Sequence, residues 1–500
     1  MFSEVKTIIK HSSVYGIANL LQKGVGFLMI PVYTHYLTPS EYGILELMDL
    51  TITVITMLIG MGLGSAIIRF YHHHDNIEDK NEVFTTSLIF TFVLCLITVS
   101  CLQCFPKYFA EIVLGEPEYY RYFQIMFIAM GLQTIASSPE CLLLAKKEAV
   151  IFSTITIGTF VSYLTLNILF LVVFKIGLIG LLLSILITKV LNTSSLLIIT
   201  LRHIKLVFSF MKLKEMVNFG MPLVLASIGM FIIHFSDRFF VQRFCDLNVL
   251  GVYSLGYKFG MILTVFVFAP FFRIWDVERF EIAKRDNGKG VFTRIFTYYS
   301  AAIIFVGLVI SVLIDEAVYI MAAPEYQGAS SVVPLIVLGY ILNGMGNFFS
   351  LGVMVTKKTR YAAYVTLFVA GINILLNIFL INRYGIMGAA IATVLTFLLL
   401  AIFNYVISQK LYPIPLEYGR VFVLFALSFC IYGLSCLVGK PLLISIGAKS
   451  LLLIAFPAAL FWGKFFYEDE ITKGTEVLKV IVFRFGIGRR FLKFAEQLKK

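Results

Sequence analysis

Apolar runs of about 20 residues recur along almost the whole chain, and this feature restricts the possible folds more than any other. A helix of about 20 apolar residues spans the roughly 30 Å hydrocarbon core of a bilayer. Hydrophobic residues make up 59% of the 500 residues. Soluble globular chains usually contain about 45–50% apolar residues. The sequence therefore excludes a soluble globular protein and predicts one embedded in a membrane.

The runs predict an all-α, polytopic membrane protein with about fourteen transmembrane helices. Short loops join the predicted helices, and no stretch is typical of an independent soluble domain. The predicted spans cover residues 12–36, 43–68, 84–105, 121–143, 150–174, 177–200, 217–241, 250–272, 295–315, 331–355, 361–381, 386–407, 420–438 and 450–467.

Lysine and arginine are distributed unevenly between the two sets of loops. If the N-terminus is cytoplasmic, the cytoplasmic segments carry about 30 of the 41 basic residues and the opposite loops about seven. The positive-inside rule then places both termini in the cytoplasm and the chain in the inner (cytoplasmic) membrane. The net charge of +12 is attributed to these loops, so no nucleic-acid partner is expected. The basic tail, residues 468–500, is expected to lie on the anionic cytoplasmic leaflet as an amphipathic segment.

Five short motifs recur in the same order in the second half of the chain, at separations between 204 and 211 residues. Five ordered matches at similar separations predict a duplication. The pairs are Gly43-Ile-Leu-x-Leu47 with Gly251-Val-Tyr-x-Leu255, Arg69-Phe-Tyr with Arg273-Ile-Trp, Pro117-Glu-Tyr with Pro324-Glu-Tyr, Lys146-Lys147 with Lys357-Lys358, and Lys175-x-Gly-x-x-Gly with Arg383-x-Gly-x-x-Gly.

The duplication predicts two six-helix lobes. Residues 1–208 form the N-lobe with spans 1–6, and residues 209–415 form the C-lobe with spans 7–12. Each copy holds an even number of spans, so both insert in the same direction, in a parallel repeat about an axis along the membrane normal. Residues 416–467 form spans 13 and 14 outside the repeat.

Local signals define two further segments. Thr38-Pro39-Ser40-Glu41 is a capping box with Pro at the first helical position, and it predicts that span 2 begins there. Gly60, Gly62 and Gly64 permit a bend or a close helix contact within the same span. Residues 273–294 predict a cytoplasmic amphipathic turn or helix.

Two segments carry a resemblance to a known family. Residues 37–47 (LTPSEYGILEL) resemble the turn after the first span of polysaccharide-biosynthesis flippases, the O-antigen type. Residues 236–258 (SDRFFVQRFCDLNVLGVYSLGYK) resemble spans seven and eight of that family, including its Asp-Arg pair. The family belongs to the multidrug/oligosaccharidyl-lipid/polysaccharide (MOP) exporter superfamily. The resemblance implies two lobes facing each other in a V around a central cavity, and the two extra C-terminal spans resemble its fourteen-span members.

The resemblance also implies a function. Proteins of this family move undecaprenyl-diphosphate-linked oligosaccharides from the inner to the outer leaflet of the cytoplasmic membrane by alternating access. The product would serve O-antigen, capsule or exopolysaccharide biosynthesis. Implied partners are the lipid-linked oligosaccharide, membrane lipids, and the polysaccharide polymerase and chain-length machinery. No cofactor is implied.

Alternatives remain open at this point. Within the superfamily they are a cation-coupled multidrug exporter and a flippase for the peptidoglycan precursor, and three basic intramembrane positions disfavour a site for cationic drugs. From another class, a membrane-bound glycan polymerase or ligase is disfavoured by the short outer loops. The sequence has no phosphate-binding glycine-rich loop with lysine and no nucleophile elbow, so an enzyme is not expected.

Three cations within predicted spans are candidates for binding the implied diphosphate: Lys23, Arg238 and Lys258. Ionisable residues are costly in a membrane and function is their default hypothesis, while cations bind phosphate oxygens through charge-assisted hydrogen bonds. The alternative for each is an interhelical ion pair or a side chain that snorkels to the interface. Asp237 is adjacent to Arg238, but adjacent helical residues point about 100° apart and need not pair.

Span 2 carries the acidic candidates, Glu46 and Asp49, on one stripe with Thr53 and Thr56. Carboxylates that face a cavity bind Na⁺ or take up protons, so this pair is a candidate for ion coupling. The alternative is that both are solvated near the outer interface or pair with Lys23. The combined hypothesis is a cavity with a cationic side for diphosphate and an acidic side for an ion. No metal-ligand cluster is predicted, and lesser candidates are His234, Asp237, Lys189 and Glu140.

Overall fold

Helices account for the regular structure throughout the described part of the protein. The computed structural model describes residues 26–202, 204–439 and 441–467, and within them there is no β-strand. The all-α prediction is therefore confirmed. Lys23, most of predicted span 1 and the tail at 468–500 lie outside the described residues.

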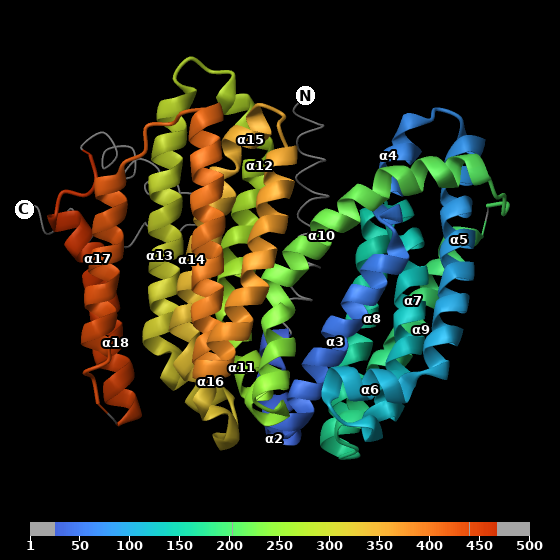
Figure 1. Cartoon of the computed structure of the whole chain (residues 1–500), viewed down its shortest axis with the longest axis horizontal. Coiled ribbons are helices and arrows are strands. Elements are labelled where there is room, and N and C mark those ends of the chain that lie inside the picture. Colours follow the sequence, from blue (N-terminus) through green and yellow to red (C-terminus); the bar gives the residue numbers. More distant parts are fainter. Residues whose placement is uncertain (1–25, 203, 440, 468–500) are drawn as a thin grey trace, which may run out of the picture. The chain divides into compact units, whose positions relative to one another are not determined.

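Figure 1 shows the helices, coloured from blue to red in their order along the chain. Short 3₁₀ and π segments, labelled η, interrupt or precede several of them. The elements are α2 (Ile30–Tyr36), α3 (Pro39–Gly60), α4 (Leu63–His73), α5 (Ile77–Cys104), α6 (Pro106–Leu114), η1 (Pro117–Tyr119), α7 (Tyr120–Ala145), α8 (Ala149–Asn167), η2 (Ile168–Val173), α9 (Leu178–Leu201), α10 (Phe210–Phe244), α11 (Leu247–Gly260), η3 (Thr264–Phe268), α12 (Ala269–Ala283), α13 (Gly288–Met321), η4 (Pro324–Val332), α14 (Val333–Phe349), α15 (Leu351–Val355), α16 (Arg360–Leu411), α17 (Tyr418–Ser435) and α18 (Leu442–Trp462).

Among the described residues, twelve helical stretches are long and apolar enough to cross a membrane, so the chain is a multi-pass membrane protein. The longest, α16, contains two predicted spans, 361–381 and 386–407. They are joined at Gly385, whose φ of 56° and ψ of −137° are not helical. Glycine adopts this positive φ at little cost because it has no Cβ. The total of fourteen stays a prediction, because span 1 falls largely outside the described residues.

The capping box at the start of the second span is confirmed. The Thr38 hydroxyl accepts a hydrogen bond from the Glu41 N–H (3.3 Å), and the Glu41 carboxylate accepts one from the Thr38 N–H (2.9 Å). Because Pro39 has no N–H, this helix end has three free N–H groups, and two of them are thereby satisfied. Helix α3 accordingly begins at Pro39.

Of the three glycines predicted to permit a bend or a close contact, Gly62 lies at a break in the span and makes a close contact there. Met61 and Gly62 both have left-handed φ values, 44° and 69°, and they separate α3 from α4. At this break the chain touches α10, where a Cβ on Gly62 would lie 2.6 Å from the Gly220 Cα. At the break between α3 and α4, the backbone of the chain is therefore in direct contact with the backbone of α10.

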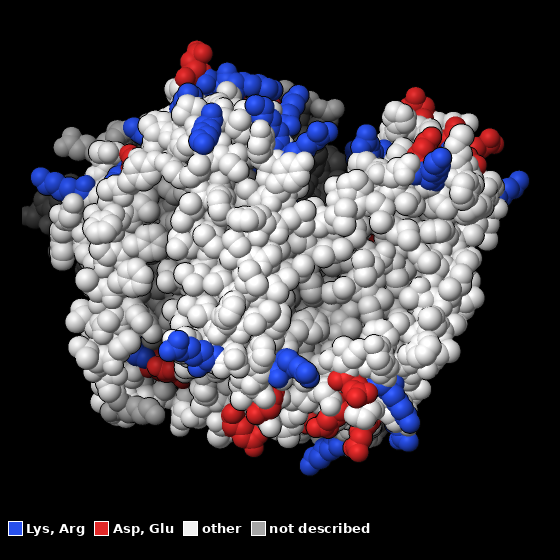
Figure 2. All heavy atoms as spheres, in the orientation of Figure 1, with Lys and Arg blue, Asp and Glu red and all other residues white. Residues whose placement is uncertain are grey.

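Basic side chains gather at one end of the helices. Residues 273–294 form the end of α12, a turn and the start of α13, and Lys284, Arg285 and Lys289 are exposed there. Figure 2 shows Lys and Arg concentrated over the end where α12 and α15 lie in Figure 1, while the end with α2 and α6 mixes both signs of charge. This distribution is the one that the positive-inside rule expects of a cytoplasmic end.

By its contacts the chain divides into two units, Met1–Pro415 and Leu416–Lys500. In the second unit α17 and α18 pack against each other. In the first unit α10 belongs to two clusters. Its first half contributes Leu213 and Met216 to a cluster with α4 and α5, and its second half contributes Ile233 to a cluster with α16. Figure 1 shows α10 crossing obliquely between these groups of helices.

The repeat predicted from sequence has structural counterparts. Gly177 (φ 67°, ψ −147°) and Gly385 share one backbone conformation. Lys147 and Lys357 also share a left-handed conformation, with φ of 59° and 58°. The sequence alignment paired Lys357 with Lys146, so the structural match of this motif differs from it by one residue. The division of the chain into lobes at residue 208 stays a prediction.

Repeat-equivalent residues also meet each other where α3 crosses α11. A Cβ on Gly43 would run into the Leu247 carbonyl oxygen, and a Cβ on Gly251 would run into the Pro39 carbonyl oxygen. The contact is reciprocal because each glycine touches the first residue of the other helix. Asp246 caps α11 by accepting from the Val249 N–H (2.7 Å), as Thr38 caps α3.

Candidate functional site

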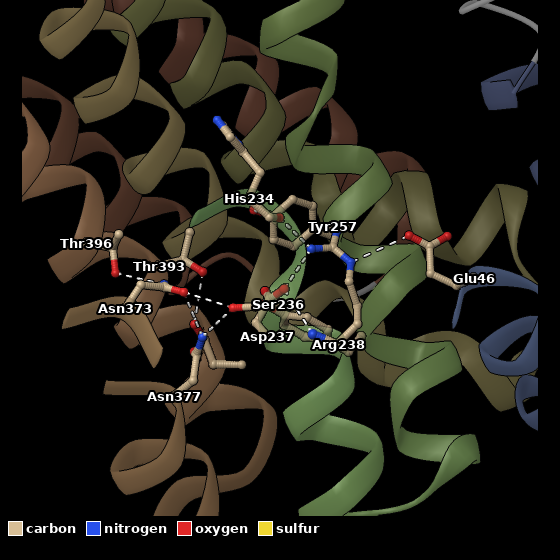
Figure 3. Close-up of polar contacts among 12 residues, drawn as sticks. Glu46, His234, Ser236, Asp237, Arg238, Tyr257, Asn373, Asn377, Thr393 and Thr396 are labelled. Atoms are coloured by element: carbon tan, nitrogen blue, oxygen red, sulfur yellow. Dashed lines mark hydrogen bonds and ion pairs between the residues drawn. The ribbon is translucent and has the colours of Figure 1, made fainter. Parts of the chain in front are cut away.

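Arg238 is the most deeply buried charge of the candidate residues, with 1% of its side chain exposed. It lies in the second half of α10, and its Nη1 donates to the Asp237 Oδ1 and to the His234 carbonyl oxygen, both at 2.8 Å. The Tyr257 ring covers the guanidinium, with 3.7 Å between Cζ and the ring centroid. These contacts are drawn in Figure 3. A buried cation requires such partners, because its removal from water is otherwise uncompensated.

Asp237 and Arg238 do pair, although they are adjacent on one helix. The long arginine side chain folds back toward the preceding turn, which overcomes the 100° between the two Cβ directions. The Asp237 carboxylate also accepts from the Tyr253 hydroxyl (2.5 Å) and from the Arg238 N–H (3.0 Å). Tyr253 and Tyr257 lie one turn apart on α11, so one face of that helix fixes the pair.

Glu46 of α3 lies between two cations that come from other helices. Its Oε1 is 3.5 Å from the Arg238 Nε, and its Oε2 is 3.8 Å from the Lys258 Nζ on α11. Lys258 is one third exposed, and its Nζ lies 4.7 Å from the centroid of the Tyr42 ring. The structure thus brings Arg238, Lys258 and Glu46 together from three helices.

This arrangement corrects the expectation of separate cationic and acidic sides. Helices α3 and α11 cross at Gly43 and Gly251, and Glu46 follows Gly43 by one turn. The crossing therefore places Glu46, on the acidic stripe of α3, next to Lys258. Acidic and basic candidates share one site instead of facing each other across it.

The charged residues continue along α3 toward α7 and α9. Asp49 is exposed, one turn beyond Glu46, and interacts electrostatically with Lys258 and Lys189. Lys189 also interacts with Glu140, which accepts a hydrogen bond from the Asn192 amide (3.1 Å). The described part of this cluster therefore holds three cations and four carboxylates: Arg238, Lys258 and Lys189 with Asp237, Glu46, Asp49 and Glu140.

The His234 side chain belongs to an aromatic cluster. Its ring centroid lies 5.0 Å from that of Phe397 and 6.3 Å from that of Tyr340. Its backbone carbonyl, and not its imidazole, binds Arg238. Within the described residues no group of three or more His, Cys, Asp or Glu is placed to hold a metal ion.

A polar network that the sequence analysis did not identify holds α10 against α16. The Ser236 hydroxyl donates to the Asn373 Oδ1 (2.9 Å), the Asn373 amide donates to the Thr396 hydroxyl (3.0 Å), and the Asn377 amide donates to the Asn373 Oδ1 (3.1 Å). Figure 3 shows this network beside Asp237 and Arg238. Two asparagines one turn apart within the apolar run 361–381 were the available signal, because amides inside a span usually bind another helix.

Comparisons with known proteins were made on sequence and on structure. A family model described as "Polysaccharide biosynthesis protein" matches residues 8–275, more than half of the chain. The succinoglycan biosynthesis transport protein ExoT of Rhizobium meliloti is 23% identical over 48% of this chain and 47% of its own. A probable low-salt glycan biosynthesis flippase of Haloferax volcanii is 23% identical over 43% and 46%. An uncharacterized membrane protein of Haemophilus influenzae is 27% identical over 53% and 63%, so these alignments span between about half and two thirds of the relatives.

Solved structures extend the similarity to nearly the whole fold. A lipid II flippase in an inward closed conformation superposes with a TM-score of 0.72 at 16% identity, covering 91% of this chain and 99% of that one. A multidrug transporter of the MOP superfamily in an inward-facing conformation gives 0.60 at 16% identity over 82% and 95%. An outward-facing structure of such a transporter gives 0.53 at 13% identity over 83% and 96%. At these identities the likeness establishes the fold.

Proposed function

Because this chain belongs to the polysaccharide biosynthesis protein family of the MOP transporter superfamily, we propose that it translocates an undecaprenyl-diphosphate-linked oligosaccharide. The direction is from the inner to the outer leaflet of the cytoplasmic membrane, for assembly of a surface polysaccharide. The relatives support this substrate class, since two of them are named as a succinoglycan transport protein and a glycan flippase. Polymerase and chain-length proteins are the proposed partners.

The observation that carries the proposal is the meeting of Arg238 and Lys258 where α10 and α11 contact α3. A diphosphate diester carries two negative charges and several acceptor oxygens, which guanidinium and ammonium donors bind through charge-assisted hydrogen bonds. The polyprenyl tail remains in lipid while the head group crosses.

Alternating access is the proposed transport mechanism. Two hydrogen bonds join the segments near α2 and η4. The Tyr326 hydroxyl donates to the Leu37 carbonyl oxygen (2.9 Å), and the Ala323 N–H donates to the Thr34 hydroxyl (3.3 Å). In the proposed cycle these bonds separate when the site opens to the outer leaflet. Transporters that share this fold have been solved in inward-facing and outward-facing conformations, which supports the proposal.

Reconstitution tests the function directly. Purified protein is incorporated into vesicles with a synthetic polyprenyl-diphosphate-linked oligosaccharide, and a membrane-impermeant glycosidase reports how much sugar is accessible outside over time. We expect faster translocation than in protein-free vesicles. Arg238→Ala is expected to slow translocation about tenfold or more, because it removes a buried cation from the site. Equal rates with and without protein would refute the proposed function.

The matched control is Arg121→Ala, which removes an exposed arginine at the start of α7. It is expected to translocate at the wild-type rate. Lys258→Ala changes a second residue of the site, at a partly exposed position. It still tests the site if Arg238→Ala fails to fold. Wild-type rates in both site variants would remove this cluster from the mechanism.

A further inference from the structure

Glu46 interacts with two cations without a short contact to either. Elsewhere in this chain ion pairs are close: Lys212 lies 2.6 Å from Asp79, and Arg238 lies 2.8 Å from Asp237. The Glu46 oxygens are 3.5 Å and 3.8 Å from their cations. Glu46 therefore supplies negative charge at this position but no hydrogen bond of ordinary length.

The Arg238 donor that faces Glu46 is correspondingly unsatisfied. The Arg238 Nε belongs to a side chain that is 1% exposed, and it has no hydrogen-bond partner. Buried guanidinium N–H groups nearly always have one, because an unpaired donor loses its hydration without compensation. Glu46 and Lys258, in contrast, are 15% and 33% exposed.

We propose that the Glu46 carboxylate occupies the position of the ligand's anion and that a ligand binds by displacing it. This inference rests on the proposed function and deepens it, because it concerns how the same cations are neutralised before the substrate binds. A phosphate oxygen placed between Arg238 and Lys258 satisfies the free Nε–H and restores short contacts. Glu46 neutralises the two buried cations when no ligand is present.

Displacement of this kind weakens the binding of every anionic ligand at this position. The Glu46 carboxylate is attached to the same protein, so it competes with the ligand at a high effective concentration. Because the same carboxylate is displaced in each case, monophosphate-linked and diphosphate-linked sugars are weakened by the same factor. Glu46 therefore lowers the affinity of the site for anions without changing its preference among them.

The test measures the dissociation constants of two synthetic ligands with the same polyprenyl chain and the same sugar. One has a diphosphate linkage and the other a monophosphate linkage, and each is titrated against the full chain in lipid nanodiscs. In Glu46→Gln we expect both ligands to bind about tenfold or more tightly than in the wild type, because the competing carboxylate is gone. The two dissociation constants fall by the same factor, so their ratio stays at the wild-type value.

The matched control is Glu118→Gln, the same change of charge at an exposed position before α7, and it is expected to keep the wild-type dissociation constants. Glu46→Ala repeats the test with a smaller side chain. Unchanged or weaker binding of both ligands in the Glu46 variants, or tighter binding of one ligand alone, overturns the inference while the proposed function stands. Binding of neither ligand by any form of the protein overturns the proposed function as well.

Discussion

The carboxylate of Asp237 fixes the position of Arg238, and two tyrosines of α11 contribute differently to that arrangement. The Tyr253 hydroxyl donates to Asp237 at 2.5 Å, whereas the Tyr257 hydroxyl donates to the His234 carbonyl oxygen at 3.3 Å. The Tyr257 ring, which covers the guanidinium, is retained when only its hydroxyl is removed. The two hydroxyls can therefore be compared by the same substitution.

Tyr253→Phe is expected to lower the free energy of unfolding by about 1–3 kcal/mol, because it leaves a buried carboxylate oxygen without its donor. Tyr257→Phe is expected to cost less than about 1 kcal/mol, since the lost hydrogen bond is long and goes to a carbonyl that Arg238 also binds. Thermal unfolding of the detergent-solubilised proteins measures the difference. A larger loss in Tyr257→Phe would contradict the assignment of Tyr253 as the partner of Asp237.

Single residues were partly predictable from sequence. Charge inside an apolar run identified Arg238, Lys258 and Glu46 as candidates, because burial of charge is costly wherever the fold places it. Their mutual contacts were not predictable, since Glu46 and Arg238 are brought together by a helix crossing and not by proximity in the chain. The pairing of Asp237 with Arg238 depended on the rotamer of a long side chain, which sequence spacing leaves undetermined.

At the scale of elements, the crossing of α3 and α11 controls the geometry of the site. Gly43 and Gly251 allow the two backbones to touch, and the acidic stripe reaches Lys258 only because they do. A methyl group at either position collides with a backbone carbonyl, which cannot rotate away as a flexible side chain can. The crossing must then separate or distort.

Gly43→Ala and Gly251→Ala are each expected to lower the free energy of unfolding by about 1–3 kcal/mol, the usual cost of overpacking. The control is Gly371→Ala in α16, where nothing lies within 4 Å of an added Cβ and where alanine is the better helix former. Thermal unfolding of the three variants tests the contact. Equal stability of Gly43→Ala and Gly371→Ala would show that the backbones do not meet at this crossing.

Local signals predicted the boundaries of elements better than their packing. The capping box gave the start of α3 and the glycines gave its break, because both depend on residues close in the chain. The path of α10 was not foreseen. Its first half packs on α4 and α5 although the repeat assigns it to the second copy, and hydrophobic pattern alone does not specify which neighbour an apolar face meets.

For the whole molecule, the apolar runs were sufficient to predict an all-α membrane protein, since lipid allows few alternatives to helices. The fold itself was implied by the resemblance of residues 37–47 and 236–258 to a known family. The orientation in the membrane stays a prediction, made from the distribution of charge. Helix α13 has 34 residues, so at about 1.5 Å per residue it is about 51 Å long, and its ends lie on opposite sides of a bilayer. Exposed lysines and arginines precede it, and η4 follows it.

Labelling of single cysteines tests this orientation. In a variant in which all seven native cysteines are replaced, Lys284→Cys before α13 and Gln327→Cys in η4 introduce exposed thiols at the two ends. Because basic loops remain on the cytoplasmic side, a membrane-impermeant maleimide is expected to label Gln327→Cys in intact spheroplasts and Lys284→Cys only after lysis. The cysteine-free parent controls for background. The reverse pattern would place the basic end outside, and the direction of transport proposed from this orientation would then be wrong.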